Sequence, residues 1–360
     1  MTSDVLIVGA RCAGAPLAML LARKGFSVAA FDRSTFPSDT ISTHFIWPEG
    51  VAALHRWSVL DMILAAGPAK CTQWFASTPD GDRREALQAV DGIAYAISLR
   101  RFKLDALLVR AAREAGADVR EHAVFDQLIF DDDRVIGIRA HDAISGKRFE
   151  ARGSIVVGAD GRDSPLARAA GAAEYNSAPS MTASYYTYTI DGETDRETLE
   201  LYTRPPREFL VTPTDDGLTM VNLVIGSALI PEFRKSVKSN FFAAFDHCSQ
   251  LAGRVRTSRH VGCIKGTVNL PNFYRQSHGP GWALVGDAGY HRDPVRAQGI
   301  HDAFLDAEDM AAAIERGLRT SSLQAELRAH QARRDDRTAG SFERSLRAAR
   351  FESPGSFTGM

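Results

Sequence analysis

The chain has 360 residues, of which 44% are hydrophobic and 24% charged, and its formal net charge is −1 at pH 7. This composition is typical of a globular protein with a large core, and the near-neutral charge disfavours nucleic acid or an anionic membrane as a partner. No apolar run reaches the about 18 residues that a membrane span needs, and the first predicted strand begins too close to Met1 for a signal peptide. The scattered cysteines predict neither a disulfide nor a metal site, so we expect a cytoplasmic protein without a bound metal.

A βαβ unit is predicted at the start of the chain. Residues 4–8 form an apolar run that ends at Gly9, residues 15–24 have a helical pattern, and residues 26–31 form a second apolar run that ends at Asp32. Such a strand-to-helix turn presents backbone N–H groups to a phosphate, and an acidic residue roughly 20 positions further on holds a ribose. The alternative is a turn that binds nothing.

The glycine pattern of this first turn is incomplete. Gly9 and Gly14 fit the pattern G-x-G-x-x-G, but Arg11 stands where the middle glycine is expected. A side chain there crowds the closest approach of the backbone to a pyrophosphate, although its charge could attract a phosphate. Asp32 disfavours a 2′-phosphate on the bound nucleotide, because the two groups would repel each other.

Two further glycine-acid turns occur far along the chain. Residues 158–161 (Gly-Ala-Asp-Gly) follow the apolar run 155–157, and residues 286–289 (Gly-Asp-Ala-Gly) follow the apolar run 282–285. Each turn comes where a strand gives way to a helix or loop. The order of the three turns predicts one dinucleotide pocket.

An amphipathic helix is predicted at about residues 299–317, after the third turn. The N–H groups of Gln298, Gly299 and Ile300 at its start have no partner within the helix and carry a partial positive charge. Such a start stabilises a negatively charged ligand. An ordinary helix cap is the alternative.

The region between the second and third turns has the pattern of an antiparallel sheet. Strands are predicted at residues 181–190, 198–203, 209–212 and 218–226, with a hairpin turn at 213–217. Alternation places Tyr186 and Tyr188 on one face and Tyr185 on the other. Tyr186 and Tyr188 could hold an aromatic ligand, or they could serve only to pack the sheet. The tail at 321–350 predicts a solvated helix packed on the body, with a partner surface as the alternative, and residues 351–360 are expected to fray.

With these three turns in order, residues 1–320 resemble the FAD-dependent oxidoreductases of the para-hydroxybenzoate hydroxylase type, a group that includes geranylgeranyl reductases and flavin-dependent halogenases. The resemblance implies an α/β fold: a Rossmann-like FAD-binding domain of the glutathione reductase type with a mixed sheet, an inserted antiparallel β-sheet substrate domain, and C-terminal helices. The implied FAD-binding domain takes residues 1–70, 98–170 and 275–320. The implied substrate domain takes residues 71–97 and 171–274, and residues 321–360 form the C-terminal helix and tail.

The resemblance also implies which residues bind FAD. Arg101 matches an arginine of the phosphate region, although its neighbour Arg100 leaves this choice open by one residue, and Val124 lies where adenine contacts arise. Asp160 belongs to the middle motif and Asp287 to the motif that holds the ribityl or pyrophosphate side. The full implied set is Gly9, Arg11, Cys12, Ala13, Gly14, Asp32, Arg33, Arg101, Val124, Asp160, Gly161, Gly286, Asp287, Pro294, Gln298, Gly299 and Ile300.

Three residues are candidates for catalysis. His44 follows a loop that passes near the flavin ring in the family, Tyr186 lies on the predicted sheet, and Arg292 lies beside Pro294. A histidine can titrate near neutral pH, which suits proton transfer. Each of the three could instead have a structural role.

The resemblance implies an NAD(P)H-dependent flavin monooxygenase. NADH or NADPH would reduce FAD, and oxygen would form a flavin C4a-hydroperoxide that hydroxylates a small, aromatic or natural-product substrate. The alternatives are a reductase or dehydrogenase that acts on an unsaturated substrate without oxygen, and a flavin-binding protein without turnover. Halogenation is disfavoured because the chain lacks a W-x-W-x-x-P motif. Ala297, where the family often has glycine, costs little unless its φ is positive.

Overall fold

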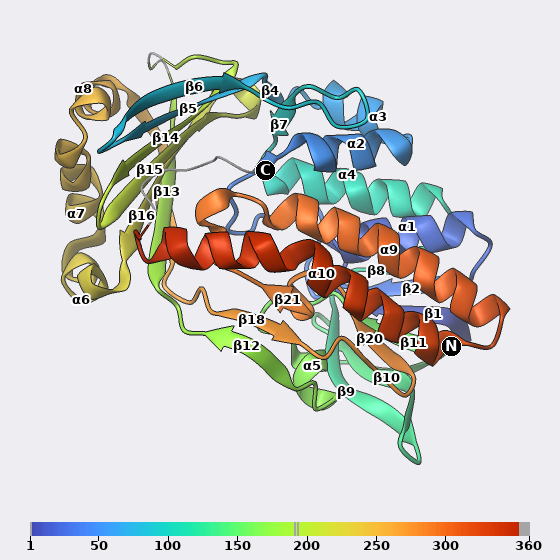
Figure 1. Cartoon of the computed structure of the whole chain (residues 1–360). Helices are drawn as coiled ribbons and strands as arrows, with labels where there is room; N and C mark the ends of the chain where they lie inside the picture. The colour runs from blue at the N-terminus through green and yellow to red at the C-terminus, as the bar shows by residue number, and fades with distance from the viewer. Residues whose placement is uncertain (1, 191, 193, 353–360) are drawn as a thin grey trace.

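The computed structural model describes residues 2–190, 192 and 194–352 (Figure 1). Its first sheet has the order β19-β20-β11-β1-β2-β8, and β10 pairs with both β11 and β9. The strands are β1 (Thr2–Val8), β2 (Val28–Phe31), β8 (Asp118–Arg120), β9 (Ala123–Asp131), β10 (Arg134–Asp142), β11 (Arg148–Gly158), β19 (His278–Gly279) and β20 (Trp282–Leu284). β1 pairs in parallel with β2 and β11, whereas β10 is antiparallel to β11, so the predicted mixed sheet is confirmed.

Both faces of this sheet are buried. Val5 and Ile7 pack with the helices on one face, and Leu6 and Val8 pack with residues of β9, β10 and α5 on the other. A parallel strand that is buried on both faces has a continuous apolar sequence, which is why a strand could be predicted at residues 4–8. The helices of this region are α1 (Gly14–Arg23), α2 (Pro48–Arg56), α3 (Leu60–Ala65), α4 (Arg101–Glu114), α5 (Pro165–Ala169) and α9 (Gly299–Arg319).

The second large sheet has the order β17-β13-β16-β15-β14-β5-β6. Its strands are β5 (Gln73–Thr78), β6 (Gly81–Ala86), β13 (Thr182–Ile190), β14 (Thr198–Arg204), β15 (Arg207–Pro213), β16 (Thr219–Gly226) and β17 (Arg259–Thr267). The strands predicted between 181 and 226 are confirmed as antiparallel neighbours. The sheet also contains one parallel pairing, between β14 and β5, because the β5–β6 hairpin joins it from an earlier part of the chain.

The two faces of this sheet contact different partners. Tyr185 packs against Phe233 on the outer side, which α6 (Ile230–Phe233), α7 (Val237–Ala244) and α8 (Ser249–Thr257) cover (Figure 1). Tyr186 and Tyr188 pack with Trp47 on the inner side, which faces the first sheet's domain. The predicted alternation of the tyrosines is therefore confirmed.

Two small sheets and a long helix complete the chain. One sheet joins β3 (Phe45–Ile46), β7 (Ala96–Ser98) and β4 (Ala69–Cys71); the other joins β12 (Glu174–Ala178), β18 (Asn272–Arg275) and β21 (Tyr290–His291). The 3-10 turns are η1 (Asp215–Gly217), η2 (Ser227–Leu229), η3 (Arg234–Ser236), η4 (Phe245–His247), η5 (Gly286–Ala288) and η6 (Pro294–Arg296).

The predicted tail helix is α10 (Leu323–Ala349), which packs along α9 and reaches the β13–β16 sheet through Ala349 and Val224 (Figure 1). Of the tail expected to fray, residues 353–360 lie outside the described residues. Within the described ranges, no helix has both the length and the apolar character that crossing a membrane requires.

Candidate functional site

The three glycine-acid turns meet at one edge of the first sheet. Val8 pairs with both Phe31 and Gly158, and Gly158 pairs with Leu284. The parallel strands β1, β2, β11 and β20 therefore end at the same level, and the chain leaves each of them beside its neighbours. The carboxyl edge of such a sheet is where open α/β folds bind ligands.

The first two turns are packed directly against each other. Gly9 has φ +98°, and a Cβ added to it would lie 2.3 Å from the carbonyl oxygen of Ala159 in the second turn. A Cβ on Gly14 would lie 1.8 Å from the carbonyl oxygen of Gly9. These two glycines thus allow the turn, the start of α1 and the second turn to approach closely, a role that requires the absence of a side chain.

Asp32 braces the first turn. Its Oδ2 accepts the N–H of Ala10 at 2.8 Å and its Oδ1 accepts the N–H of Ser34 at 2.8 Å. An ionised carboxylate has about four acceptor positions, so two remain for a ligand hydroxyl. The predicted ribose contact is compatible with this bracing role and stays a prediction.

A buried carboxylate holds both arginines of the predicted phosphate region. Asp105, whose side chain is fully buried, accepts from Arg11 Nη1 at 2.7 Å and from Arg101 Nε at 2.8 Å. Burial lowers the pKa of Arg101, but the charge of Asp105 outweighs it and the pKa lies above its ordinary value. Arg101 lines the cavity described below, whereas Arg100 pairs with Asp215, so Arg101 is the better-placed of the two neighbours.

The middle turn begins a short helix. Asp160 accepts the Ser164 hydroxyl at 2.5 Å and the Leu166 N–H at 3.0 Å, so its carboxylate caps α5. Burial raises the pKa of Asp160 above its ordinary value. Gly161 has φ +82°, and a Cβ there would meet no atom within 4 Å.

The late turn is fixed from behind by the two long helices. The N–H of Gly286 donates to Asp306 Oδ2 at 2.7 Å, and His330 of α10 lies 3.0 Å from the other Asp306 oxygen. Arg334 of α10 also donates to the carbonyl oxygen of Gly289 at 3.0 Å. Asp287 is left exposed at the cavity and makes no hydrogen bond with any other described residue.

The loop before α9 has a strained backbone at Ala297. Its φ of 51° lies in the left-handed region, so the condition under which alanine is costly is met here. The Trp47 Nε1–H donates to the carbonyl oxygens of Arg296 and Ala297, at 3.2 and 3.1 Å, and holds the loop. Gln298 Oε1 is buried without a hydrogen-bond partner in the described part of the chain.

These features surround one large cavity, of about 840 Å³, between the first sheet's edge, the second sheet's inner face and α10. Every residue of the implied FAD-binding set except Gly14 lines it. A volume of this order is within the usual range for a small-molecule or cofactor site. The geometry thus brings the implied set together, although the contacts themselves stay predictions.

The three candidate catalytic residues differ in whether they reach the cavity. Tyr186 and Arg292 line the cavity, but His44 is fully buried and does not. His44 Nε2 lies 2.6 Å from the Tyr188 hydroxyl, and the His44 ring makes an edge contact with Tyr186. Burial lowers the pKa of His44 to about 3, so the imidazole is neutral at physiological pH. Its position supports Tyr186 from behind, and its role in catalysis stays a prediction.

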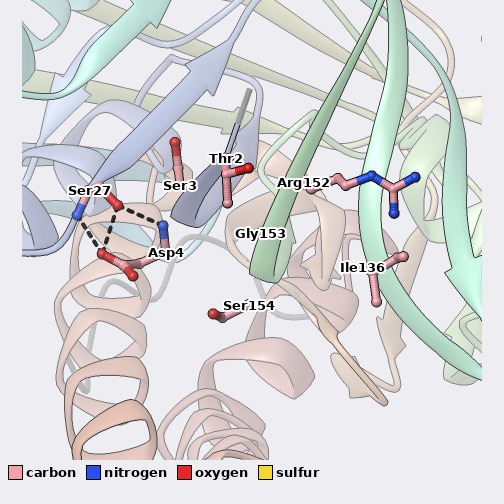
Figure 2. Close-up of a pocket in the computed structure, with 8 residues that line it drawn as sticks. All are labelled: Thr2, Ser3, Asp4, Ser27, Ile136, Arg152, Gly153 and Ser154. Atoms are coloured by element: carbon pink, nitrogen blue, oxygen red, sulfur yellow. Dashed lines mark hydrogen bonds between the residues drawn. The ribbon is translucent and has the colours of Figure 1, made fainter.

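A smaller cavity of about 340 Å³ lies at the other end of the first sheet (Figure 2). Asp4 Oδ2 accepts the N–H and the hydroxyl of Ser27 there, at 2.8 and 2.7 Å, which ties the start of β1 to the start of β2. These are the amino ends of the parallel strands, away from all three turns. We therefore place the candidate site in the larger cavity.

Several lining residues were not predicted from the sequence. Ser184 lies on the inner face of the second sheet and donates a 2.8 Å hydrogen bond to Asn222, a polar residue of the predicted strand 218–226 that could have faced either the pocket or solvent, and α10 contributes Arg334, Thr338 and Ser345. The α10 residues lie near one face of the helix, which is the only signal that the sequence offered. Residue spacing could not show that this face closes a cavity formed by distant turns.

Comparisons with known proteins agree with this geometry. Residues 2–345 match a family model described as FAD binding domain. The digeranylgeranylglycerophospholipid reductase of Methanosarcina mazei is 28% identical over 316 residues, covering 86% of this chain and 74% of that protein.

Solved structures show the same fold at lower identity. The myxobacterial chondrochloren halogenase CndH matches with a TM-score of 0.89 and 21% identity, over 95% of this chain and 81% of that one. PqsL, a probable FAD-dependent monooxygenase from Pseudomonas aeruginosa, matches with a TM-score of 0.84 and 18% identity, over 97% and 96%. At these identities, the likeness shows the fold alone.

Proposed function

This chain belongs to the FAD binding domain family of FAD-dependent oxidoreductases, and within it we propose that the chain is an NAD(P)H-dependent flavin monooxygenase that hydroxylates a small polar substrate, aromatic or derived from a natural product. The observation that carries the proposal is the polar lining of the cavity beneath the second sheet. The proposal has three parts: the fit of FAD, the substrate side, and the need for oxygen.

The cavity fits FAD on its own geometry. The backbone at Gly161 and Gly299 borders empty space, because a Cβ on either glycine would meet no atom within 4 Å. Gln298 Oε1 has no hydrogen-bond partner among the described residues, so it can accept from a ligand. The first turn and the start of α1 would hold the pyrophosphate with backbone N–H groups, and the start of α9 would face the flavin ring. When bound, FAD supplies the hydride and oxygen chemistry.

The substrate side of the cavity is polar rather than a long apolar channel. Ser184, Tyr186 and Asn222 lie on the inner face of β13 and β16, and Arg292 lies across from them on the segment before Pro294. Because the Ser184 hydroxyl donates to Asn222 Oδ1, the side-chain N–H groups of Asn222 can donate to a ligand. Such a surface suits a compact substrate with hydrogen-bonding groups.

The protein's own residues would bind and orient the substrate, and they would exclude water from the cavity. Tyr186, only 2% exposed, is fixed by edge contacts to His44 and Tyr188, so it offers a rigid wall for an aromatic substrate. Burial raises the pKa of Tyr186 to about 12, so its hydroxyl keeps its proton. Tyr186 would therefore donate a hydrogen bond to substrate rather than act as a base.

A reductase acting on an unsaturated substrate without oxygen is the second candidate. It is favoured by the 28% identity to a digeranylgeranylglycerophospholipid reductase over most of this chain. The polar residues under the second sheet argue against a long apolar substrate, which would leave those groups without partners.

Oxygen dependence separates the candidate functions. We expect the FAD-loaded protein to oxidise NADH or NADPH in air, with oxygen consumed, and to stop under nitrogen once the bound flavin is reduced. Peroxide and hydroxylated product are measured together, with small aromatic acids and phenols as trial substrates. Sustained NAD(P)H oxidation under nitrogen with an unsaturated acceptor would favour the reductase. No oxidation under either gas would favour a flavin-binding protein without turnover.

The late turn offers a test of cofactor retention. Asp287→Ala should weaken FAD binding by about tenfold or more, because it removes a charged hydrogen-bonding group at the cavity. Tyr186→Ala, on the substrate side, should leave FAD affinity nearly unchanged. Both variants are measured by titration of the cofactor-free protein with FAD. Equal affinities in the two variants would contradict the assignment of Asp287.

A further inference from the structure

A buried pair of polar side chains lies on the inner face of the second sheet. Ser184 of β13 is 7% exposed and Asn222 of β16 is 3% exposed, and both line the cavity. In the register of these two strands, Ser184 lies opposite Val224 and Tyr186 lies opposite Asn222, so Ser184 and Asn222 are diagonal neighbours on one face. Buried polar groups of this kind are costly unless each finds a hydrogen-bond partner.

The pair uses only part of its hydrogen-bonding capacity. The Ser184 hydroxyl donates to Asn222 Oδ1 at 2.8 Å, so its oxygen is left only as an acceptor. The amide N–H groups of Asn222 make no hydrogen bond with another residue in the described part of the chain, and the amide nitrogen is not fully enclosed by protein atoms. Because Asn222 lines the cavity, these N–H groups open into it. The pair therefore presents a donor and an acceptor side by side.

Two cations on this side of the cavity already have carboxylate partners. Arg292 Nη2 donates to Asp302 Oδ2 at 2.6 Å, and Lys265 of β17 pairs with Asp39. The serine and asparagine side chains carry no charge themselves. Their donor and acceptor therefore match an uncharged ligand group better than an ion.

The ring of Tyr186 lies beside the pair. Tyr186 is directly opposite Asn222 across the two strands, and such partners have Cβ atoms about 4.5–5.5 Å apart. An edge contact with the His44 ring, with 5.6 Å between the ring centroids, fixes the orientation of Tyr186. A ligand with a flat ring could thus pack against Tyr186 while its polar group reaches Ser184 and Asn222.

Building on the proposed function, we propose that Ser184 and Asn222 form a subsite for an uncharged carbonyl group of the substrate that has an N–H or O–H group beside it. The carbonyl oxygen accepts from the Asn222 amide, and the neighbouring N–H or O–H donates to Ser184 Oγ. A substrate without these groups leaves both side chains unpaired, which lowers its affinity. The substrate class is thus a ring-bearing amide, or a ketone with an amino or hydroxyl group beside it.

Binding measurements on the FAD-loaded protein test this subsite without turnover. Calorimetric titration compares three probes of nearly the same shape: benzamide has a carbonyl and an amide N–H, acetophenone has the carbonyl alone, and α-methylstyrene has neither. We expect benzamide to bind about tenfold more tightly than acetophenone, and acetophenone about tenfold more tightly than α-methylstyrene. Each step in this series removes one hydrogen bond.

Two variants assign each hydrogen bond to its side chain. Asn222→Leu should weaken acetophenone and benzamide by about tenfold each and leave α-methylstyrene within about twofold, because only the amide donor is lost. Ser184→Ala should weaken benzamide by about tenfold, so that it binds no better than acetophenone, whereas acetophenone should change by no more than about threefold.

Asn240→Leu is the matched control. Asn240 of α7 donates to the carbonyl oxygens of Glu232 and Phe233 and does not line the cavity, so this variant should leave all three affinities unchanged. The affinity for FAD is measured in every variant by titration of the cofactor-free protein, and thermal unfolding shows whether each variant is folded. If Asn222→Leu does not fold, Ser184→Ala, which removes a single oxygen atom, still tests the subsite.

Four results would overturn the subsite. They are equal affinities for the three probes in the unmodified protein, binding of none of them, equal weakening of all three in Asn222→Leu, and a loss of FAD affinity as large as the loss of benzamide affinity. The last result would assign the pair to the cofactor. Failure of oxygen-dependent hydroxylation would remove the monooxygenase but not the subsite, because the titrations require no turnover.

Discussion

Replacing Asp105 by asparagine should lower the free energy of unfolding by about 3–5 kcal/mol, because two arginines then lose their common buried carboxylate. Arg11 and Arg101 both donate to this side chain, which is fully buried. Asparagine keeps the shape and removes the charge, so the loss reports the ion pairs rather than a cavity. Urea denaturation of the cofactor-free protein, followed by circular dichroism, measures it.

The same helix supplies a matched control. Arg110 and Glu114 form an ion pair on α4 with the same four-residue spacing as Arg101 and Asp105, but the Glu114 side chain is 56% exposed. Exposed pairs of this kind contribute about 0.3–0.5 kcal/mol, so Glu114→Gln should change stability by no more than that. A loss of similar small size in both variants would show that Asp105 is not the anchor of the phosphate region.

Replacing Gly9 by alanine should cost about 3 kcal/mol or more and abolish FAD retention. The alanine would have to adopt φ +98°, and its Cβ would lie 2.3 Å from the carbonyl oxygen of Ala159, so the first two turns would have to separate. Because the clash is with backbone, a change of side-chain rotamer cannot relieve it. Thermal unfolding and FAD titration measure the two effects.

Gly161 is the control for backbone strain alone. It also has positive φ, +82°, but a Cβ there would meet no atom within 4 Å. Gly161→Ala should therefore cost only about 1–2 kcal/mol, the usual penalty for the left-handed conformation. If Gly9→Ala and Gly161→Ala were equally stable, the need for glycine at position 9 would not arise from the close packing of the first two turns.

The turns and strands that hold the site were predictable from local sequence. Residues 4–8, 155–157 and 282–285 are short apolar runs that end in glycine, and each proved to be a strand ending at the same edge. The alternation at Tyr185 and Tyr186 likewise gave the two faces of the second sheet. At these positions, the same few neighbouring residues determine both the hydrophobic pattern and the burial of the strand. A short stretch of sequence is therefore enough to predict the strand and its faces.

Contacts between distant residues were not predictable. The pairing of Arg11 with Asp105 joins positions 94 residues apart, and nothing local to Arg11 shows that its charge is already compensated. The resemblance implied that residues 71–97 belong to the substrate domain, but the β5–β6 hairpin and its parallel pairing with β14 were not predicted, for the same reason. The positive φ of Ala297 was stated only as a condition, because it depends on the Trp47 side chain that holds the loop.

A crystal structure of the chain grown with FAD tests the central claim most directly. The account predicts one FAD per chain, with its adenine end beside Val124, its pyrophosphate between the first turn and Arg101, and its ring beside Pro294 and Gly299, all of which line the cavity. FAD bound outside this cavity, or a protein that takes up no flavin at saturating concentration, would contradict it.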